Sequence, residues 1–137
     1  MGSNASTAYE AQALPTKTST TLQSPTKKGQ VTAFHSSSKW KLHFEASKQT
    51  SKLIVIYFTA SWCGPCKHIL PSVNEFAEKY ADVDFIKIDV DELDDVAQEF
   101  GVQAMPTFIL MKKGKEVDKI VGAKKDDLQK KIEKHRF

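Results

Sequence analysis

The sequence has little of several things, and each shortage excludes a class of protein. No apolar run approaches the roughly 20 residues that a membrane-spanning helix needs, and no signal-peptide core follows the first residues, so export is not expected. The formal net charge is only +3, which does not indicate a nucleic-acid-binding protein. With 137 residues, 40% of them hydrophobic, the chain has room for one domain with a sizeable core but not for two.

Cysteine is the scarcest reactive residue, because the chain has two, within Cys63-Gly64-Pro65-Cys66. A small secreted domain usually carries several disulfides, so one close pair indicates a reducing compartment and a chemical role. A structural crosslink over so short a loop would stabilise the fold very little. A zinc site needs four ligands, and no two of the histidines have ligand spacing: His35, His43, His68 and His135. These two alternatives are therefore the weaker interpretations.

The pattern changes near residue 30. Residues 1–29 are rich in Ser and Thr, are broken by Pro15 and Pro25, and show no hydrophobic period, so we predict a disordered N-terminal extension. Most of the positive charge lies there, where Lys17, Lys27 and Lys28 oppose only Glu10. Residues 30–137 are predicted to form the folded domain.

Hydrophobic periodicity in the second part predicts alternating strands and helices. Leu53–Phe58 is an almost unbroken apolar run, as in a strand that is buried on both faces. Strands are predicted at 31–34, 53–58, 83–90, 106–111 and 116–122, with a hairpin turn at Lys113-Gly114-Lys115, and helices near 37–44, after Cys63, at 93–100 and at 126–137. The order β-α-β-α-β-α-β-β-α predicts an α/β fold with a mixed central β-sheet and helices on both faces.

One acidic stretch needs a separate interpretation. Residues 89–95, DVDELDD, have some likeness to a calcium loop, but they lack Gly at the sixth position and put Leu93 at a ligand position. We therefore interpret this stretch as the solvated start of a helix, and no metal site is predicted.

The cysteine pair lies where a buried strand ends and a helix begins. Free backbone N–H groups and the positive end of the helix dipole stabilise an anion there, so Cys63 is expected to form a nucleophilic thiolate readily. Cys66 is one turn further into the helix. Gly64 lets a partner chain approach, Pro65 suits the first turn, and Lys67 adds positive charge. Cys63 is predicted to attack a disulfide of another protein, and Cys66 to resolve the mixed disulfide.

At "WCGPCK" the sequence resembles the thioredoxin family, most closely the plant h-type thioredoxins, and the resemblance covers residues 30–137. Further positions agree in order and spacing: Pro71 in the active-site helix, Met105-Pro106-Thr107 with a cis bond before the proline, Gly114 in the hairpin, and Gly122-Ala123. The resemblance implies the thioredoxin fold and the reduction of protein disulfides. It implies electrons from NADPH through a separate thioredoxin reductase. The chain lacks a Gly-rich dinucleotide fingerprint, so no bound cofactor is expected besides the redox-active disulfide of Cys63 and Cys66. The protein is expected to be a monomer.

The resemblance also implies a contact surface for target proteins. An extended target segment would pair with the exposed backbone of Met105 as an added strand. The flat apolar surface expected around the cysteines consists of Trp62, Gly64, Pro65, Val102, Ala104, Met105, Pro106, Val121, Gly122 and Ala123. For Val102 and Val121, packing in the core is an equal alternative.

Two rival functions fit parts of the pattern. A disulfide oxidase or isomerase keeps the strand-CxxC-helix site but usually has His between the cysteines, where this chain has Gly64 and Pro65. A non-enzymatic scaffold of the same fold would not need both cysteines. Reduction of insulin disulfides with NADPH and a thioredoxin reductase would distinguish a disulfide reductase from an oxidase or isomerase and from a scaffold.

Tyr57 is a departure from the family. Thioredoxins usually bury a carboxylate six positions before the first cysteine, where it is thought to take the proton of the inner thiol, and this chain has Tyr57 there. A phenol, with an unperturbed pKa of about 10, is a poor base at neutral pH. Either a water near Tyr57 and Lys87 serves instead, or the mixed disulfide is resolved more slowly. The alternative interpretation is that Tyr57 only fills core space.

The first residues, Met1-Gly2-Ser3-Asn4-Ala5-Ser6, match the N-myristoylation pattern M-G-x-x-x-[ST]. One acyl chain gives marginal, reversible binding, so the sequence predicts a cytoplasmic protein in partial, exchangeable association with membranes through Gly2. A cloning remnant is an alternative origin of these residues. A mitochondrial transit peptide is the rival, because the extension is Ser-rich and acid-poor, although it has no arginine.

Overall fold

The computed structural model describes residues 28–137. Residues 1–27 of the predicted N-terminal extension, and with them Gly2, lie outside the described residues. The described part has the predicted element order, with these bounds: β2 (Val31–Phe34), α1 (Ser37–Ser47), β3 (Ile54–Thr59), α2 (Gly64–Lys79), β4 (Asp84–Asp89), α3 (Asp94–Glu99), β5 (Thr107–Lys112), β6 (Lys115–Val121) and α4 (Lys125–His135).

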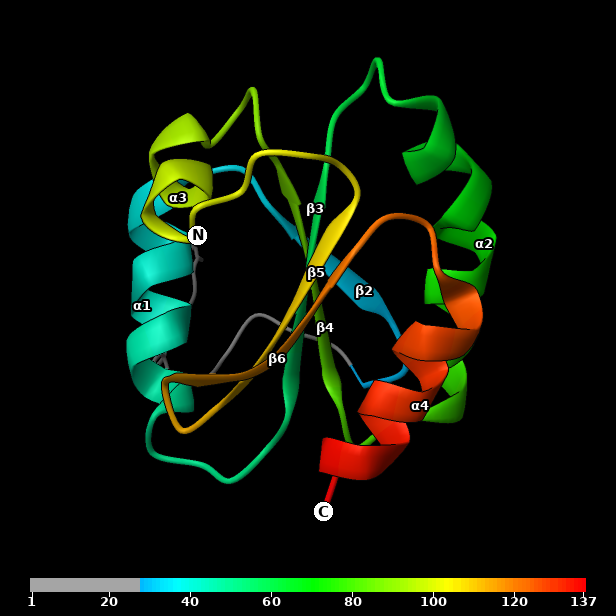
Figure 1. The fold of residues 1–137 in the computed structure, drawn as a ribbon. Coiled ribbons are helices and arrows are strands. Elements are labelled where there is room, and N and C mark those ends of the chain that lie inside the picture. The colour runs from blue at the N-terminus through cyan, green and yellow to red at the C-terminus, as the bar shows by residue number, and fades with distance from the viewer. Residues whose placement is uncertain (1–27) are drawn as a thin grey trace, which may run out of the picture.

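The strands form one mixed sheet in the order β2-β4-β3-β5-β6. The first three lie parallel to one another, whereas β5 and β6 run antiparallel to their neighbours. Helices α1 and α3 cover one face of the sheet, and α2 and α4 cover the other (Figure 1). This is the thioredoxin fold, and it confirms the predicted mixed sheet with helices on both faces.

The central strand β3 is buried along its whole length. Its successive side chains point to opposite faces, so Val55 and Tyr57 enter the core beneath α2 and α4, while Ile54, Ile56 and Phe58 enter the core beneath α1 and α3. An unbroken apolar run is what a strand with helices on both sides requires.

The hairpin between β5 and β6 has a two-residue loop, Lys113-Gly114, and both residues have positive φ, 53° and 81°. This combination is typical of the tight turns that match the twist of antiparallel strands. Gly114 adopts this backbone without steric cost, because it has no Cβ atom. A Cβ atom at Gly114 would also lie 2.8 Å from Cγ of Lys48.

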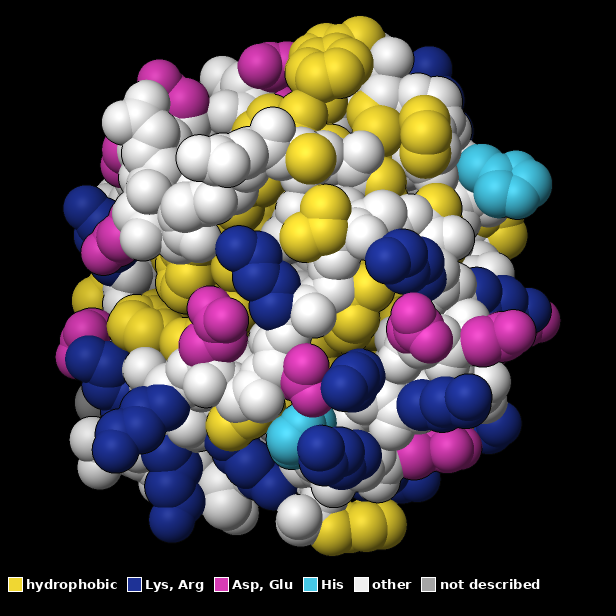
Figure 2. Space-filling model, viewed as in Figure 1, with side chains coloured by type: hydrophobic (Ala, Val, Ile, Leu, Met, Phe, Trp, Pro, Cys, Tyr) yellow, Lys and Arg dark blue, Asp and Glu magenta, His cyan; other side chains and the backbone are white. Residues whose placement is uncertain are grey.

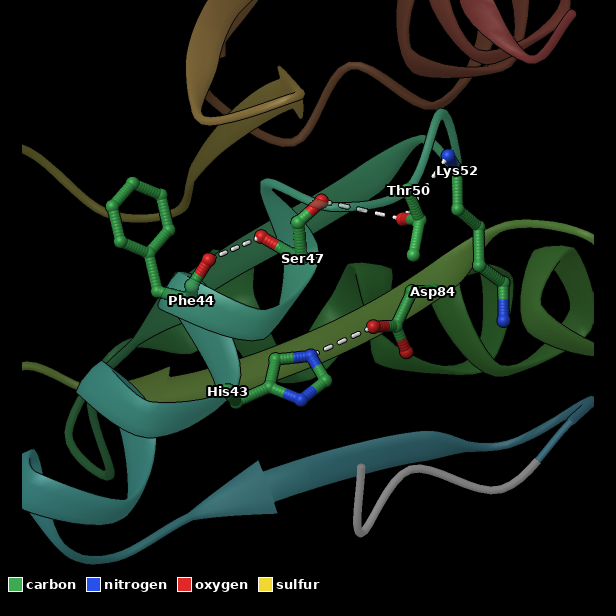
Figure 3. A network of polar contacts seen from close by, with 6 residues as sticks. All are labelled: His43, Phe44, Ser47, Thr50, Lys52 and Asp84. Atoms are coloured by element: carbon green, nitrogen blue, oxygen red, sulfur yellow. Dashed lines mark hydrogen bonds and ion pairs between the residues drawn. The ribbon is translucent and has the colours of Figure 1, made fainter. Parts of the chain in front are cut away.

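Helix α1 begins after Ser36, whose side chain accepts a hydrogen bond from the backbone N–H of Lys39, as the run of serines predicts. Its buried residues are Trp40 and His43, whereas Leu42 is 73% exposed. His43 Nε2 lies 2.8 Å from Oδ2 of Asp84 at the start of β4 (Figure 3). This buried polar pair links α1 to the sheet.

No described helix is both long and apolar enough to cross a membrane.

Candidate active site

The two cysteines lie at the start of α2 and are joined by a disulfide, with their Cα atoms 5.3 Å apart. Cys63 is the N-cap residue of the helix, and its Sγ accepts a hydrogen bond from the backbone N–H of Cys66 at 3.2 Å. Pro65 occupies the first turn, where its missing N–H costs nothing. A helix N-terminus with an N–H group directed at Sγ stabilises a thiolate on Cys63 once the disulfide is reduced.

Both cysteines are more buried than their position at a helix start suggests. Cys63 is 4% exposed and Cys66 is fully buried, while Gly64 and Pro65 between them are exposed. Both side chains belong to the core beneath α2 and α4. The outer sulfur is thus that of Cys63, and Cys66 faces the interior.

A pocket of about 210 Å³ lies on the inner side of Cys66. Beneath α2 it is lined by two cross-strand pairs, Tyr57 with Lys87 and Thr59 with Asp89, which lie next to each other on β3 and β4. The remaining lining residues are Ala60, Ser61, Cys66, Lys67 and Leu70. The expected proximity of Lys87 to Tyr57 follows from this register.

Tyr57 is 2% exposed, and its ring stacks on Phe108 at a centroid distance of 5.1 Å. Its hydroxyl donates a hydrogen bond of 2.7 Å to the carbonyl oxygen of Cys66. Burial raises the pKa of the Tyr57 phenol above its ordinary value, and a hydrogen bond with the Thr59 side chain offsets only part of this rise. The phenol therefore stays protonated at neutral pH and acts as a donor that ties β3 to the active-site helix.

The residues of the expected target surface come from three loops at the same end of the molecule. Trp62 is 66% exposed, Ala104 and Ala123 are exposed, and Met105 and Gly122 are half-buried. Figure 2 shows hydrophobic side chains at this end with a few acidic ones beside them, whereas lysine and arginine side chains lie mainly over the opposite part of the same face.

Pro106 and Gly122 connect two of these loops. The bond between Met105 and Pro106 is cis, as the resemblance implied. Pro106 is buried, and its carbonyl oxygen accepts a 2.8 Å hydrogen bond from the N–H of Gly122. The two valines differ, because Val121 is 45% exposed whereas Val102 packs against the core beneath α1 and α3.

Two acidic residues near the site were missed by the sequence analysis. Trp62 Nε1 donates a 2.8 Å hydrogen bond to Oδ2 of Asp91, which holds the exposed indole. Asp89 lines the pocket beside Cys66. A signal for Asp89 existed, since residues two apart on a strand share a face, and Asp89 is two positions after Lys87.

Residues 28–137 contain no group of three or more His, Cys, Asp or Glu side chains that could hold a metal ion. The chemistry of the site is that of the disulfide itself. A redox-active cysteine pair at the start of a helix that follows the central strand of this fold defines a thiol-disulfide oxidoreductase.

The comparisons with known proteins give the family. The thioredoxin family profile matches residues 32–134. Thioredoxin H2 of Arabidopsis thaliana is 58% identical over 106 residues, which cover 77% of this chain and 80% of that protein. The crystal structure of a thioredoxin h from Nicotiana alata superposes with a TM-score of 0.79 at 64% identity, over 84% of this chain and 100% of that one. The chain belongs to the thioredoxin family.

Proposed function

We propose that this chain reduces disulfide bonds in other proteins and is returned to the dithiol state by an NADPH-dependent thioredoxin reductase. The observation that carries the proposal is the position of Cys63, whose sulfur caps α2 and accepts the N–H of Cys66. That position favours the thiolate on the outer sulfur and keeps the inner sulfur within reach for resolution.

The reaction has two exchange steps. The thiolate of Cys63 attacks a target disulfide, one target sulfur leaves as a thiolate that takes up a proton, and a mixed disulfide forms. Cys66 then loses its proton and attacks Sγ of Cys63, so the bond to the target breaks and the second target thiol is released. Two electrons pass to the target, and the Cys63–Cys66 disulfide remains to be reduced.

Target binding is proposed for the uncharged surface around Cys63. An extended segment of the target would run beside Met105, between Trp62 and the Gly122-Ala123 loop. Exposure of Trp62, Ala104 and Ala123 supports this placement, because an added strand gains affinity from main-chain hydrogen bonds and selectivity from side-chain contacts.

Insulin reduction tests the proposal. With NADPH and a thioredoxin reductase, the chain should reduce insulin disulfides catalytically, and the double variant Cys63→Ser, Cys66→Ser should not. Weak reduction together with strong oxidation of dithiols would instead identify an oxidase or isomerase. Inertness in both assays would leave only the scaffold function.

The electron donor can be tested in the same assay. One structural relative is the thioredoxin f2 in a complex with ferredoxin:thioredoxin reductase, with a TM-score of 0.72 and 36% identity. We expect our chain to accept electrons faster from the NADPH-dependent enzyme than from the ferredoxin-dependent one. The reverse preference would overturn this part of the proposal.

The proposed location is the cytoplasm, with part of the protein held reversibly on membranes by an acyl chain on Gly2. The support is the sequence pattern at the N-terminus. Imaging of the intact chain with a C-terminal fluorescent fusion should show a membrane fraction that Gly2→Ala abolishes. Removal of the extension in the mature protein, seen by mass spectrometry, would instead support a mitochondrial transit peptide.

A further inference from the structure

The resolving step needs an acceptor for the proton of Cys66, and Tyr57 does not provide one. The phenol is already a donor to the carbonyl of Cys66, and burial raises its pKa. The other two lining side chains with an ionisable group apart from Asp89 are Lys67 and Lys87, and both are amines. Asp89 is therefore the single carboxylate among the residues that line this pocket.

The sheet register explains why Asp89 is in this position. Tyr57 pairs with Lys87, and Thr59 pairs with Asp89, so the four side chains form a patch of two by two residues on one face of the sheet. That face is the one beneath α2. Phe85, two positions before Lys87 on β4, points to the same face and belongs to the same core as Cys66. Asp89 is the last residue of β4, at the end of the sheet where β3 leads to the cysteines.

The carboxylate of Asp89 is held in place by the chain that follows it. Its Oδ1 accepts hydrogen bonds from the backbone N–H of Asp91 at 2.9 Å and of Glu92 at 3.3 Å. Both bonds engage the same oxygen. The position of the group is thus fixed by the turn before α3, while the half-buried side chain reaches the pocket.

The geometry points to Asp89 as the acceptor that takes the proton of the Cys66 thiol through solvent in the pocket, in place of the missing carboxylate at position 57. This inference rests on the proposed function. In the step, the S–H bond of Cys66 breaks and its proton passes to Asp89. Cys66 Sγ forms a bond with Cys63 Sγ, the bond from Cys63 to the target sulfur breaks, and the target leaves as a thiolate.

The other polar groups that line the pocket come from three elements. Lys87 lies on β4 and Lys67 on α2, and both side chains end in an amine and not in a carboxylate. Tyr57 on β3 is neutral. Ser61 and Lys67 are both exposed, so the pocket reaches solvent, from which the proton can be exchanged after the step.

Asp89→Asn isolates the charge, because the amide oxygen still accepts the hydrogen bonds from Asp91 and Glu92. The reduced protein is mixed with an aromatic disulfide whose thiol absorbs visible light. Attack by Cys63 releases one chromophore in a phase that depends on reagent concentration, and resolution by Cys66 releases the second in a phase that does not. We expect Asp89→Asn to slow the second phase about tenfold or more, to move its pH midpoint upward, and to leave the first phase within about twofold.

Three variants complete the experiment. Asp94→Asn removes the same charge from the exposed first turn of α3 and should change neither phase. Asp89→Glu keeps a carboxylate and should recover most of the second phase. Tyr57→Asp in the Asp89→Asn background supplies a carboxylate from β3 and should also restore it.

The possible negative results distinguish a failure of the inference about Asp89 from a failure of the proposed function. If Asp89→Asn resolves at the rate and pH profile of the parent while both reduce insulin, Asp89 is only a turn residue and the inference is wrong. If the parent itself releases no second chromophore and does not reduce insulin, the proposed function fails. Should Asp89→Asn not fold, the second phase of Asp89→Glu decides, because a shifted pH midpoint is expected only if the carboxylate takes part.

Discussion

Strand β4 carries a carboxylate at each end, and the two ends have opposite surroundings. Asp84 begins the strand, is 8% exposed, and contacts His43 of α1 beneath the helices α1 and α3. Asp89 ends the strand, faces α2, and lines a pocket that contains a reactive sulfur. Because the two residues are an odd number of positions apart, they point to opposite faces of the same strand.

The difference between these two ends shows how one strand supplies both structure and chemistry. A carboxylate whose partner is a buried side chain contributes to stability, and its removal deprives that partner of one buried hydrogen bond. A carboxylate that is fixed by backbone N–H groups and faces a pocket remains available to a thiol. Variants at the two ends should therefore have separable effects on activity and on folding.

The largest effect on activity is expected for the two cysteines, which lie beside the end of β4 that carries Asp89. Cys66→Ser should lose turnover and accumulate covalent complexes with targets through Cys63, because the mixed disulfide forms but is not resolved. Cys63→Ser should lose turnover without accumulating complexes, since Cys66 is fully buried. Pull-down from an extract, followed by non-reducing gel electrophoresis, measures the trapped fraction, and equal trapping by both variants would contradict this order of attack.

The next effect concerns the pocket. Tyr57→Asp places a carboxyl group where burial raises its folded pKa above the unfolded value of about 3.9. Such a group destabilises the fold increasingly as the pH rises from the unfolded pKa to the folded one. We expect the loss of stability at pH 7 to exceed the loss at pH 4 by about 3 kcal/mol, in addition to a pH-independent loss from removal of the buried ring. We also expect a raised pKa of the Cys63 thiol, because like charges disfavour ionisation.

Tyr57→Phe is the matched control for that substitution. It keeps the stack on Phe108 and removes the hydrogen bond to the carbonyl of Cys66, so its cost of about 1 kcal/mol should not depend on pH between 4 and 7. Chemical denaturation at the two pH values, with the rate of thiol alkylation measured against pH, checks both variants. A pH-independent loss in Tyr57→Asp with an unchanged Cys63 profile would place this position outside the reactive centre.

The role of the other end of β4, where Asp84 contacts His43, is tested with Asp84→Ala. The substitution removes the acceptor that faces His43 in a buried setting, and we expect the free energy of unfolding to fall by about 1–3 kcal/mol. Insulin reduction per folded molecule should stay the same. Glu45→Ala removes an exposed carboxylate from α1, the helix that carries His43, and is the control, which should change stability by less than about 0.5 kcal/mol. A loss of activity at unchanged stability would abolish the distinction between the two ends.

The smallest effect is expected at Asp118 on β6, which belongs to neither end of β4. Burial acts to raise the pKa of Asp118, but hydrogen bonds from His135, the Lys119 backbone and Lys131 outweigh it, and the pKa is lowered overall. Its contribution is present above the unfolded pKa and is lost as the pH falls through the lower folded value. Asp118→Asn should cost less than about 1 kcal/mol at pH 7, and in denaturation curves the difference should disappear as the pH falls below the lowered pKa of the Asp118 carboxyl group.

The sequence predicted those features whose causes are local. The apolar run of β3, the Lys113-Gly114 turn and the serine cap of α1 each depend on residues next to one another, and the structure confirms them. The cysteine motif predicted its place at a helix start for the same reason, and the helix begins at Gly64.

Features that depend on register were harder to predict. The pairing of Thr59 with Asp89 exists only once β3 and β4 are aligned, and the acidic stretch was interpreted by its composition as a solvated helix start. His43 was considered only as a metal ligand, whereas it is buried against Asp84, 41 positions away in the chain. The hydrogen bond from Trp62 to Asp91 likewise joins two loops that the sequence does not align.

The hydrogen bond from Gly122 to the carbonyl of Pro106 has a consequence for how such proteins diversify. It closes the open end of the β5–β6 hairpin, so the spacing between the two loops beside Cys63 is set by strand pairing and not by the loop sequences. If the proposed target surface is right, substitutions at its exposed positions Ala104 and Ala123 are therefore expected to change which targets dock, while the spacing of the loops beside Cys63 stays the same.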